Sequence, residues 1–163
     1  MMQRSVVLVK PDGLQRGLVG EIIHRFERKG MKLVGLKMVR MTDEVVDEWY
    51  AHHRDKDFFA DLKGFMQSAP VVAMVWEGVE AVATVRKLCG VTAGRQAEGG
   101  SIRGDFAMST QMNLIHAADS EATAKKELGL LFKDGEIFDY EMCGLPWMYG
   151  KQELEKENQA DNG

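Results

Sequence analysis

Short apolar runs alternate along the chain with stretches in which apolar residues recur every three or four positions. The runs at 5–9, 31–41, 71–76 and 114–116 have the composition of strands, and the stretches between them have the spacing of amphipathic helices. The predicted order is strand, helix, strand, helices, strand, helix, strand. We therefore expect an α+β fold, a ferredoxin-like βαββαβ sandwich in which a four-stranded antiparallel sheet packs against helices in a single domain.

Single residues mark where several of these elements begin, end or bend. Gly30 closes the first helix, Thr42 is placed to cap the second, and Gly90 ends the helix after the third run. Gly35, inside the second run, predicts a β-bulge. The segment 91–102 holds several glycines and no apolar periodicity, so we expect a loop there.

The last thirteen residues differ in composition from the rest of the chain. They read KQELEKENQADNG and contain no apolar periodicity after Leu154. Such a composition favours a flexible tail over packed structure. We expect residues 1–150 to form the domain and residues 151–163 to form a polar, flexible C-terminal tail, with no linker or repeat dividing the domain.

Composition narrows the class of protein. A chain of 163 residues with a net charge of −4 suits one globular domain and argues against a general nucleic-acid coat, so we expect no dedicated nucleic-acid site. Two cysteines, Cys89 and Cys143, give no disulfide framework and no zinc site, which favours a reducing, cytoplasmic setting. No apolar run approaches membrane-spanning length, and we expect no membrane partner.

The fourth run ends in a titratable side chain, His116. It is followed by small and acidic residues, and Asp119 or Ser120 is placed to cap the helix that begins at Glu121. The pattern therefore predicts a strand, a tight turn and a helix with an imidazole at the corner. Taken alone, a histidine in this position is more typical of a hydrogen-bonded structural residue than of a reactive one.

Glu127 gives this histidine a possible partner. It lies on or beside the apolar stripe of the predicted helix, three residues after Ala124 and four before Leu131. A carboxylate there is costly to bury without a partner, and an N–H of His116 would be one. That bond would fix the tautomer and leave the other ring nitrogen as a nucleophile. The alternative, a Glu127 side chain extended into solvent, is equally consistent with the pattern.

The chain lacks both a P-loop and the Rossmann glycine turn, so any phosphate must be bound mainly by side chains. Lys10, Arg86 and Arg103 all follow or end predicted elements, where three cations can converge on one polyphosphate. Thr92 and Asn113 are placed to add hydrogen bonds. Each of these cations, taken singly, is more typical of a solvated surface charge than of a phosphate ligand.

Several ordered motifs resemble the nucleoside diphosphate kinase family. They are V-K-P-D-G-x-Q-R-G from Val9, I-R-G-D-F from Ile102, N-x-x-H-x-x-D-S from Asn113 and W-M-Y from Trp147. The resemblance extends from about Arg4 to Gly150. It implies a ping-pong transfer in which His116 takes the γ-phosphate of ATP or another nucleoside triphosphate, becomes phosphohistidine, and passes the group to a nucleoside diphosphate.

The resemblance also implies roles for other residues. Glu127 matches the acid that orients the histidine, Tyr50 matches the aromatic residue near the nucleophile, and Phe58 matches the ring that stacks on the base. Without the resemblance, Phe58 is more typical of a core residue. The remaining matches are phosphate and ribose contacts, of which Lys10 is also expected to take part in catalysis: Lys10, Arg86, Thr92, Arg103 and Asn113.

Members of this family use Mg²⁺ held mainly through the nucleotide phosphates, and they assemble as hexamers or tetramers. The resemblance therefore implies Mg²⁺ as cofactor with no protein metal ligand, and a homo-oligomer, more readily a hexamer than a tetramer. The expected loop at 91–102 forms part of the family's assembly contacts.

Two positions depart from the family pattern. Ala118 stands where the family usually has Ser, so a hydroxyl that joins the histidine–glutamate network is missing. Ala93 and Gly94 stand where the family commonly has Asn-Pro, which removes a rigid proline from the loop. The first departure bears on turnover and the second on loop rigidity and assembly. They leave an alternative open: a weakly active or regulatory nucleotide-binding protein on the same fold.

Overall fold

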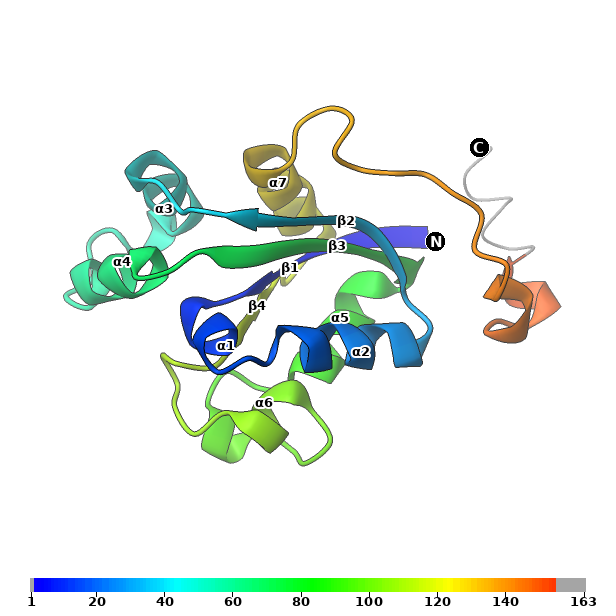
Figure 1. The fold of residues 1–163 in the computed structure, drawn as a ribbon, viewed down its shortest axis with the longest axis horizontal. Helices are drawn as coiled ribbons and strands as arrows, with labels where there is room; N and C mark the ends of the chain where they lie inside the picture. Colours follow the sequence, from blue (N-terminus) through cyan, green and yellow to red (C-terminus); the bar gives the residue numbers. More distant parts are fainter. Residues whose placement is uncertain (1, 155–163) are drawn as a thin grey trace.

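The computed structural model describes residues 2–154, apart from the side chain of His52. Its centre is a four-stranded sheet in the order β2-β3-β1-β4, in which every neighbouring pair is antiparallel (Figure 1). The strands are β1 (Met2–Val9), β2 (Lys32–Val39), β3 (Val71–Val79) and β4 (Ile115–Ala117). The α+β fold predicted from the sequence, with its βαββαβ order, is confirmed.

Helices cover both faces of this sheet. They are α1 (Pro11–Gln15), α2 (Val19–Lys29), α3 (Asp43–Trp49), α4 (Phe59–Gln67), α5 (Ala81–Cys89), α6 (Ile102–Phe106) and α7 (Glu121–Leu131), with 3-10 turns η1 (Ala51–His53), η2 (Gly94–Gln96) and η3 (Leu145–Trp147). Figure 1 shows α7 on one side of the sheet, α2, α5 and α6 on the other, and α3 and α4 at its end. Apolar residues of α3, α4 and α7 belong to the same core cluster.

The strand β1 lies at the centre because both of its faces are apolar. Val7 and Val9 point into the core beneath α2 and α5, while Val6 and Leu8 point into the core beneath α3, α4 and α7. All four side chains are fully buried. The continuous apolar run therefore indicated a central strand correctly, since each alternate position meets a different hydrophobic layer.

The local signals in the sequence have their expected effects. Gly30 ends α2 with a left-handed φ of 92°, which glycine adopts without steric cost. The Thr42 side chain accepts from the Val45 amide and caps α3. The register of β2 against β3 shifts between Leu33 and Gly35, as the predicted bulge requires.

Two short helices were not predicted. The Pro11–Gly13 turn continues as the five-residue helix α1, and α6 forms between the loop and β4, where no helix was expected. Helices of this length are too short to show an apolar period. Ser101 nevertheless caps α6 by accepting from the Gly104 amide, and that cap was the readable signal.

The segment after α7 runs back along β2, where the Phe138 amide donates to the Val34 carbonyl at 2.8 Å. The Tyr149 hydroxyl then accepts from the Val79 amide. Residues 151–154 are helical, and the rest of the expected flexible tail, 155–163, lies outside the described residues. None of the helices within residues 2–154 is long and apolar enough to cross a membrane.

Candidate active site

A cavity of about 740 Å³ opens where the ends of β1 and β4 meet α3, α5, α6 and α7. Every residue that the sequence analysis assigned to the site lines this cavity: Lys10, Tyr50, Phe58, Arg86, Thr92, Arg103, Asn113, His116 and Glu127. They come from eight separate segments of the chain. The fold therefore brings the whole predicted set together.

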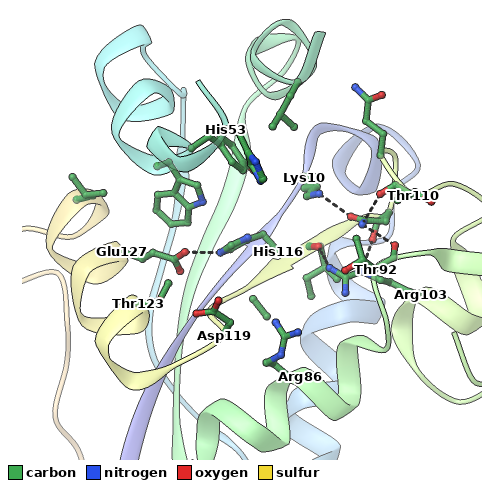
Figure 2. A pocket seen from close by; sticks show the side chains of 18 of the residues that line it. Lys10, His53, Arg86, Thr92, Arg103, Thr110, His116, Asp119, Thr123 and Glu127 are labelled. Atoms are coloured by element: carbon green, nitrogen blue, oxygen red, sulfur yellow. Dashed lines mark hydrogen bonds and ion pairs between the residues drawn. The ribbon is translucent and has the colours of Figure 1, made fainter. Parts of the chain in front are cut away.

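His116 and Glu127 form the pair that the helix pattern left open. His116 lies opposite Leu8 in the sheet, so its side chain faces the layer that contains α7. The ring Nε2 lies 2.7 Å from Glu127 Oε1, and Glu127 is only 6% exposed, which excludes a side chain extended into solvent. Because a carboxylate only accepts, Nε2 carries the proton in this bond, and in the neutral imidazole Nδ1 then keeps its lone pair. Figure 2 shows the imidazole between Glu127 and the basic residues of the cavity.

The second oxygen of the Glu127 carboxylate has no hydrogen-bond partner among the described residues. This atom, Oε2, is buried. Ala118, two residues after His116, is fully buried against Val82 and Ala124. The position where the family usually carries a hydroxyl is thus apolar and closed to solvent, and it contacts Ala124 on the helix that carries the unpaired acceptor.

Aromatic rings surround the histidine and the mouth of the cavity. Trp49 packs against His116 edge to face, with ring centroids 5.2 Å apart. Tyr50, at the end of α3, is buried, and burial together with the charge of Glu127 raises the pKa of its phenol, so it stays a neutral hydroxyl. His53 contacts the rings of both Tyr50 and Phe58. Phe58 is 51% exposed, so the core role that its sequence context suggests is wrong.

Lys10 is buried at the carboxyl end of β1. Its Nζ donates to Asn113 Oδ1 at 2.7 Å, and the Asn113 amide nitrogen donates to the carbonyls of Thr92 and Thr110 (Figure 2). Burial and the neighbouring Arg103 lower the pKa of Lys10 to about 8, against an opposing influence from Asp12. Lys10 is therefore not a solvated surface charge, and the network fixes Lys10, Thr92 and Asn113 relative to one another.

Arg103 is likewise buried and is held by the backbone. Its guanidinium donates to the carbonyls of Gly90, Asn113 and Ile115, the last at 2.6 Å. Burial lowers the pKa of this guanidinium. A guanidinium has five N–H groups, so two remain for a ligand. The surface-charge interpretation fails here too, because Arg103 ties α6 to the segment that leads into β4.

Arg86 differs from the other two cations. It projects from the last turn of α5, is exposed, and has no hydrogen bond or ion pair with the residues that the structure describes. Figure 2 shows its side chain directed toward the cavity beneath Asp119. Its guanidinium is thus free to meet a ligand in a way that Arg103 is not.

The loop that lacks the family's proline is held in another way. The Gly94 amide donates to the Ser109 carbonyl at 3.2 Å, and a Cβ on Gly94 would lie 2.4 Å from the Ala107 carbonyl oxygen. Arg95 adds a bond to the Met108 carbonyl. A proline has no N–H and could not make the first bond. The Ala93-Gly94 sequence is therefore accommodated by a backbone contact.

Several lining residues were not predicted for the site. Trp49 was not assigned to the site, and Asp119 was assigned only to the helix cap, a role that Ser120 fills by accepting from the Thr123 amide. Asp12, which lies outside the cavity lining, was not assigned to the site either, although its carboxylate accepts from the Leu114 amide across 102 positions of sequence. The nearness of Asp12 to Lys10 in the K-P-D-G motif was the available signal.

Comparisons with known proteins place this geometry in context. The family model for nucleoside diphosphate kinase matches residues 3–137. A nucleoside diphosphate kinase of Parabacteroides distasonis is 51% identical over 153 residues, which cover 94% of this chain and 100% of the relative.

Solved structures agree. A nucleoside diphosphate kinase of Halobacterium salinarum in complex with CDP superposes with a TM-score of 0.89 at 45% identity, covering 91% of this chain and 99% of that one. A nucleoside diphosphate kinase family protein of Babesia bovis gives a TM-score of 0.87 at 42% identity, covering 90% and 99%.

Proposed function

This chain belongs to the nucleoside diphosphate kinase family, and from that premise we propose that it moves the terminal phosphoryl group of a nucleoside triphosphate onto a nucleoside diphosphate by way of His116. The observation that carries the proposal is the pairing of His116 Nε2 with Glu127 at 2.7 Å on the wall of a cavity that also holds three cations. The pairing leaves Nδ1 as the nucleophilic atom.

The reaction has two steps that mirror each other. The Nδ1 lone pair attacks the γ-phosphorus, the Nδ1–P bond forms, the bond to the bridging oxygen breaks, and the diphosphate leaves with that electron pair. A terminal oxygen of a second diphosphate then attacks the phosphorus and releases His116. Glu127 keeps the imidazole in one tautomer and stabilises the positive charge that develops on the ring.

The cations neutralise the charge that moves during transfer. Lys10 and Arg103 are buried and held in place, so they cost little reorganisation when charge develops, while the exposed Arg86 closes onto the phosphates from α5. Thr92 and Asn113 contribute hydrogen bonds to phosphate and ribose.

The aromatic residues have simpler tasks. Phe58 offers an exposed ring at the mouth, and stacking on an aromatic face tolerates any base, which suits an enzyme that serves several nucleotides. Tyr50, a neutral phenol beside Glu127, offers its hydroxyl group as a hydrogen-bond donor in the cavity that contains His116.

Mg²⁺ fits this site as a companion of the nucleotide. The donor set consists of cationic, amide and separate acidic groups, and within residues 2–154 no three His, Cys, Asp or Glu side chains are grouped to hold a metal. The ion would be held by β- and γ-phosphate oxygens, where it supplies charge neutralisation. Lys10, Arg86 and Arg103, which line the cavity, would share the neutralisation of the phosphates with the ion.

A homo-oligomer, a hexamer rather than a tetramer, belongs to the same proposal. The edge strand β2 exposes Leu36 and Met38, and Phe138 beside it is 63% exposed. Val91 and Met108, in and next to the loop, are also exposed. Sedimentation equilibrium distinguishes six chains from four.

A reducing, cytoplasmic setting fits the two free cysteines, of which Cys143 is exposed.

Initial-rate kinetics test the proposal. With ATP varied at several fixed concentrations of a diphosphate, we expect parallel double-reciprocal lines, because the first product leaves before the acceptor binds. His116→Ala should abolish transfer while nucleotide binding persists. Intersecting lines, or transfer by the His116→Ala variant, would exclude a phosphohistidine route. Tight nucleotide binding with negligible transfer by the native chain would favour the regulatory alternative, for which the unpaired Glu127 Oε2 is the supporting observation.

A further inference from the structure

The backbone just before His116 is strained. Leu114 has a φ of +72°, in the left-handed region that a bulky residue rarely adopts. The Ile115 amide donates to the Asn113 carbonyl at 2.8 Å, so the three residues form a γ-turn of the unfavourable, positive-φ kind. The Leu114 side chain is fully buried, so the turn is closed in on all sides. Strain of this kind persists only where surrounding contacts over-determine it.

Those contacts come from the segment that follows β1. Asp12 Oδ2 accepts from the Leu114 amide at 3.0 Å, and the Lys10 amide donates to the Leu114 carbonyl at 2.8 Å. A Cβ on Gly13 would lie 3.0 Å from that same carbonyl oxygen, so the two backbones are in close contact. Asp12 is the one side chain, within the described part of the chain, that hydrogen-bonds to the strained amide.

The turn positions three parts of the site at once. Asn113, at its start, bridges Lys10 to the carbonyls of two loops. Ile115, at its end, accepts from Arg103 at 2.6 Å through its carbonyl. The next residue is His116 itself. Movement of the turn would therefore change the distance from the nucleophile to two cations together.

We propose that Asp12 is a positioning residue for phosphoryl transfer: its carboxylate holds the strained turn at Leu114 and, through it, sets His116 against Lys10 and Arg103. This inference rests on the proposed role of His116. Asp12 acts through the turn and need not touch the nucleotide. Its other oxygen, Oδ1, is buried without a hydrogen-bond partner among residues 2–154, so the carboxylate is not placed there for its own solvation.

Two substitutions separate the position of the acceptor from its charge. Asp12→Asn keeps an oxygen at the same distance from the Leu114 amide but removes the charge, whereas Asp12→Glu keeps the charge but moves the oxygen by one methylene. Asp134→Ala, an exposed acid in the loop after α7, is the control for loss of a surface carboxylate. For each protein, the single-turnover rate of His116 phosphorylation by saturating ATP is measured, normalised to the plateau of phosphoenzyme.

We expect Asp12→Glu to phosphorylate about tenfold more slowly or worse, which corresponds to about 1.4 kcal/mol of lost positioning, and Asp12→Asn to stay within about threefold of the native rate. Normalisation to the plateau removes any loss of folded protein, so a merely structural role would leave the rate unchanged. Equal rates for Asp12→Glu and the native chain would overturn the inference, as would an Asp12→Asn variant as slow as Asp12→Glu.

Amide hydrogen exchange of the native chain gives a reading that needs no variant. The Leu114 amide should exchange as slowly as the β1 amides, and exchange at the rate of an exposed loop would refute the role of Asp12. The two proposals fail differently. If the native chain carries no label on His116, the proposed function fails; if it does and the Asp12→Glu rate is native, only the Asp12 inference fails.

Discussion

Replacing Ala118 by Ser adds a single hydroxyl at a buried position that contacts α7, the helix that carries Glu127 and its unpaired oxygen Oε2. The Ala118 amide donates to the Val6 carbonyl, so the chain is still extended there and residues 116 and 118 face the same layer as α7. Ala118 packs against Ala124 on that helix and also against Val82 on α5. A hydroxyl at this position therefore points toward the element that carries Glu127.

The magnitude follows from the state of Glu127 Oε2. A buried acceptor without a partner costs about 1–3 kcal/mol, and a hydrogen bond to a charged group contributes about 1.5–3 kcal/mol. Part of this gain is opposed by the tight packing of Ala118 against Val82 and Ala124. Only the share that improves the hold on His116 in the transition state raises the rate, which limits the acceleration to roughly tenfold. The rest appears as an increase in the free energy of unfolding.

Rapid-quench phosphorylation by saturating ATP measures the effect, with nucleotide affinity determined separately and expected to change little. Ala73→Ser is the matched control, because Ala73 is also fully buried in the sheet but lies on β3, which β1 separates from β4. We expect it to lose stability without gaining rate. If Ala118→Ser phosphorylates no faster than the native chain, the missing partner of Glu127 Oε2 does not limit the reaction.

Three further predictions concern the cations and the loop. Arg86→Ala should lower kcat/KM by an amount equivalent to about 2 kcal/mol of transition-state stabilisation, with an almost unchanged melting temperature. Arg103→Ala should lower both kcat/KM and the melting temperature, because Arg103 also donates hydrogen bonds to three backbone carbonyls. Equal melting temperatures for the two variants would contradict this. The value of kcat/KM should fall as pH rises through about 8, because Lys10 loses its proton there; the same fall in a Lys10→Gln variant would contradict this assignment. Between pH 8 and 10.5, Lys10 keeps its proton in the unfolded chain but has lost it in the folded chain. The contribution of Lys10 to the free energy of unfolding should therefore rise with pH over this range. Gly94→Pro should lower the melting temperature, because it removes the bond to the Ser109 carbonyl and its ring meets a packed backbone, and calorimetry showing stabilisation would be the opposite result.

Much of the fold could be predicted because its signals are local. The β1 run is apolar at every position, and the fold buries both of its faces; Gly30, Gly35 and Thr42 each have the backbone or capping role that their chemistry favours. The short helices escaped prediction since five residues cannot show a period. Their positions are set by tertiary contacts, such as the ion pair between Arg25 and Asp105.

The sequence predicted which residues belong to the site, but it did not predict how they are arranged. Resemblance to a family grouped the nine lining residues, while spacing alone left Glu127 undecided between His116 and solvent. No local pattern could show that Arg103 is buried and held by three carbonyls, since its partners lie up to thirteen positions away. The strained turn at Leu114 was equally invisible, because a positive φ at leucine comes from packing and not from propensity.

In the proposed reaction, His116 carries the phosphoryl group on Nδ1, because Glu127 holds Nε2. Incubation with γ-labelled ATP and no acceptor, followed by ³¹P NMR and mass spectrometry of the labelled protein, tests it most directly. We expect an acid-labile label on His116, bonded to Nδ1, that moves to an added nucleoside diphosphate. A label on another residue, or a phosphorus bonded to Nε2, would contradict the account.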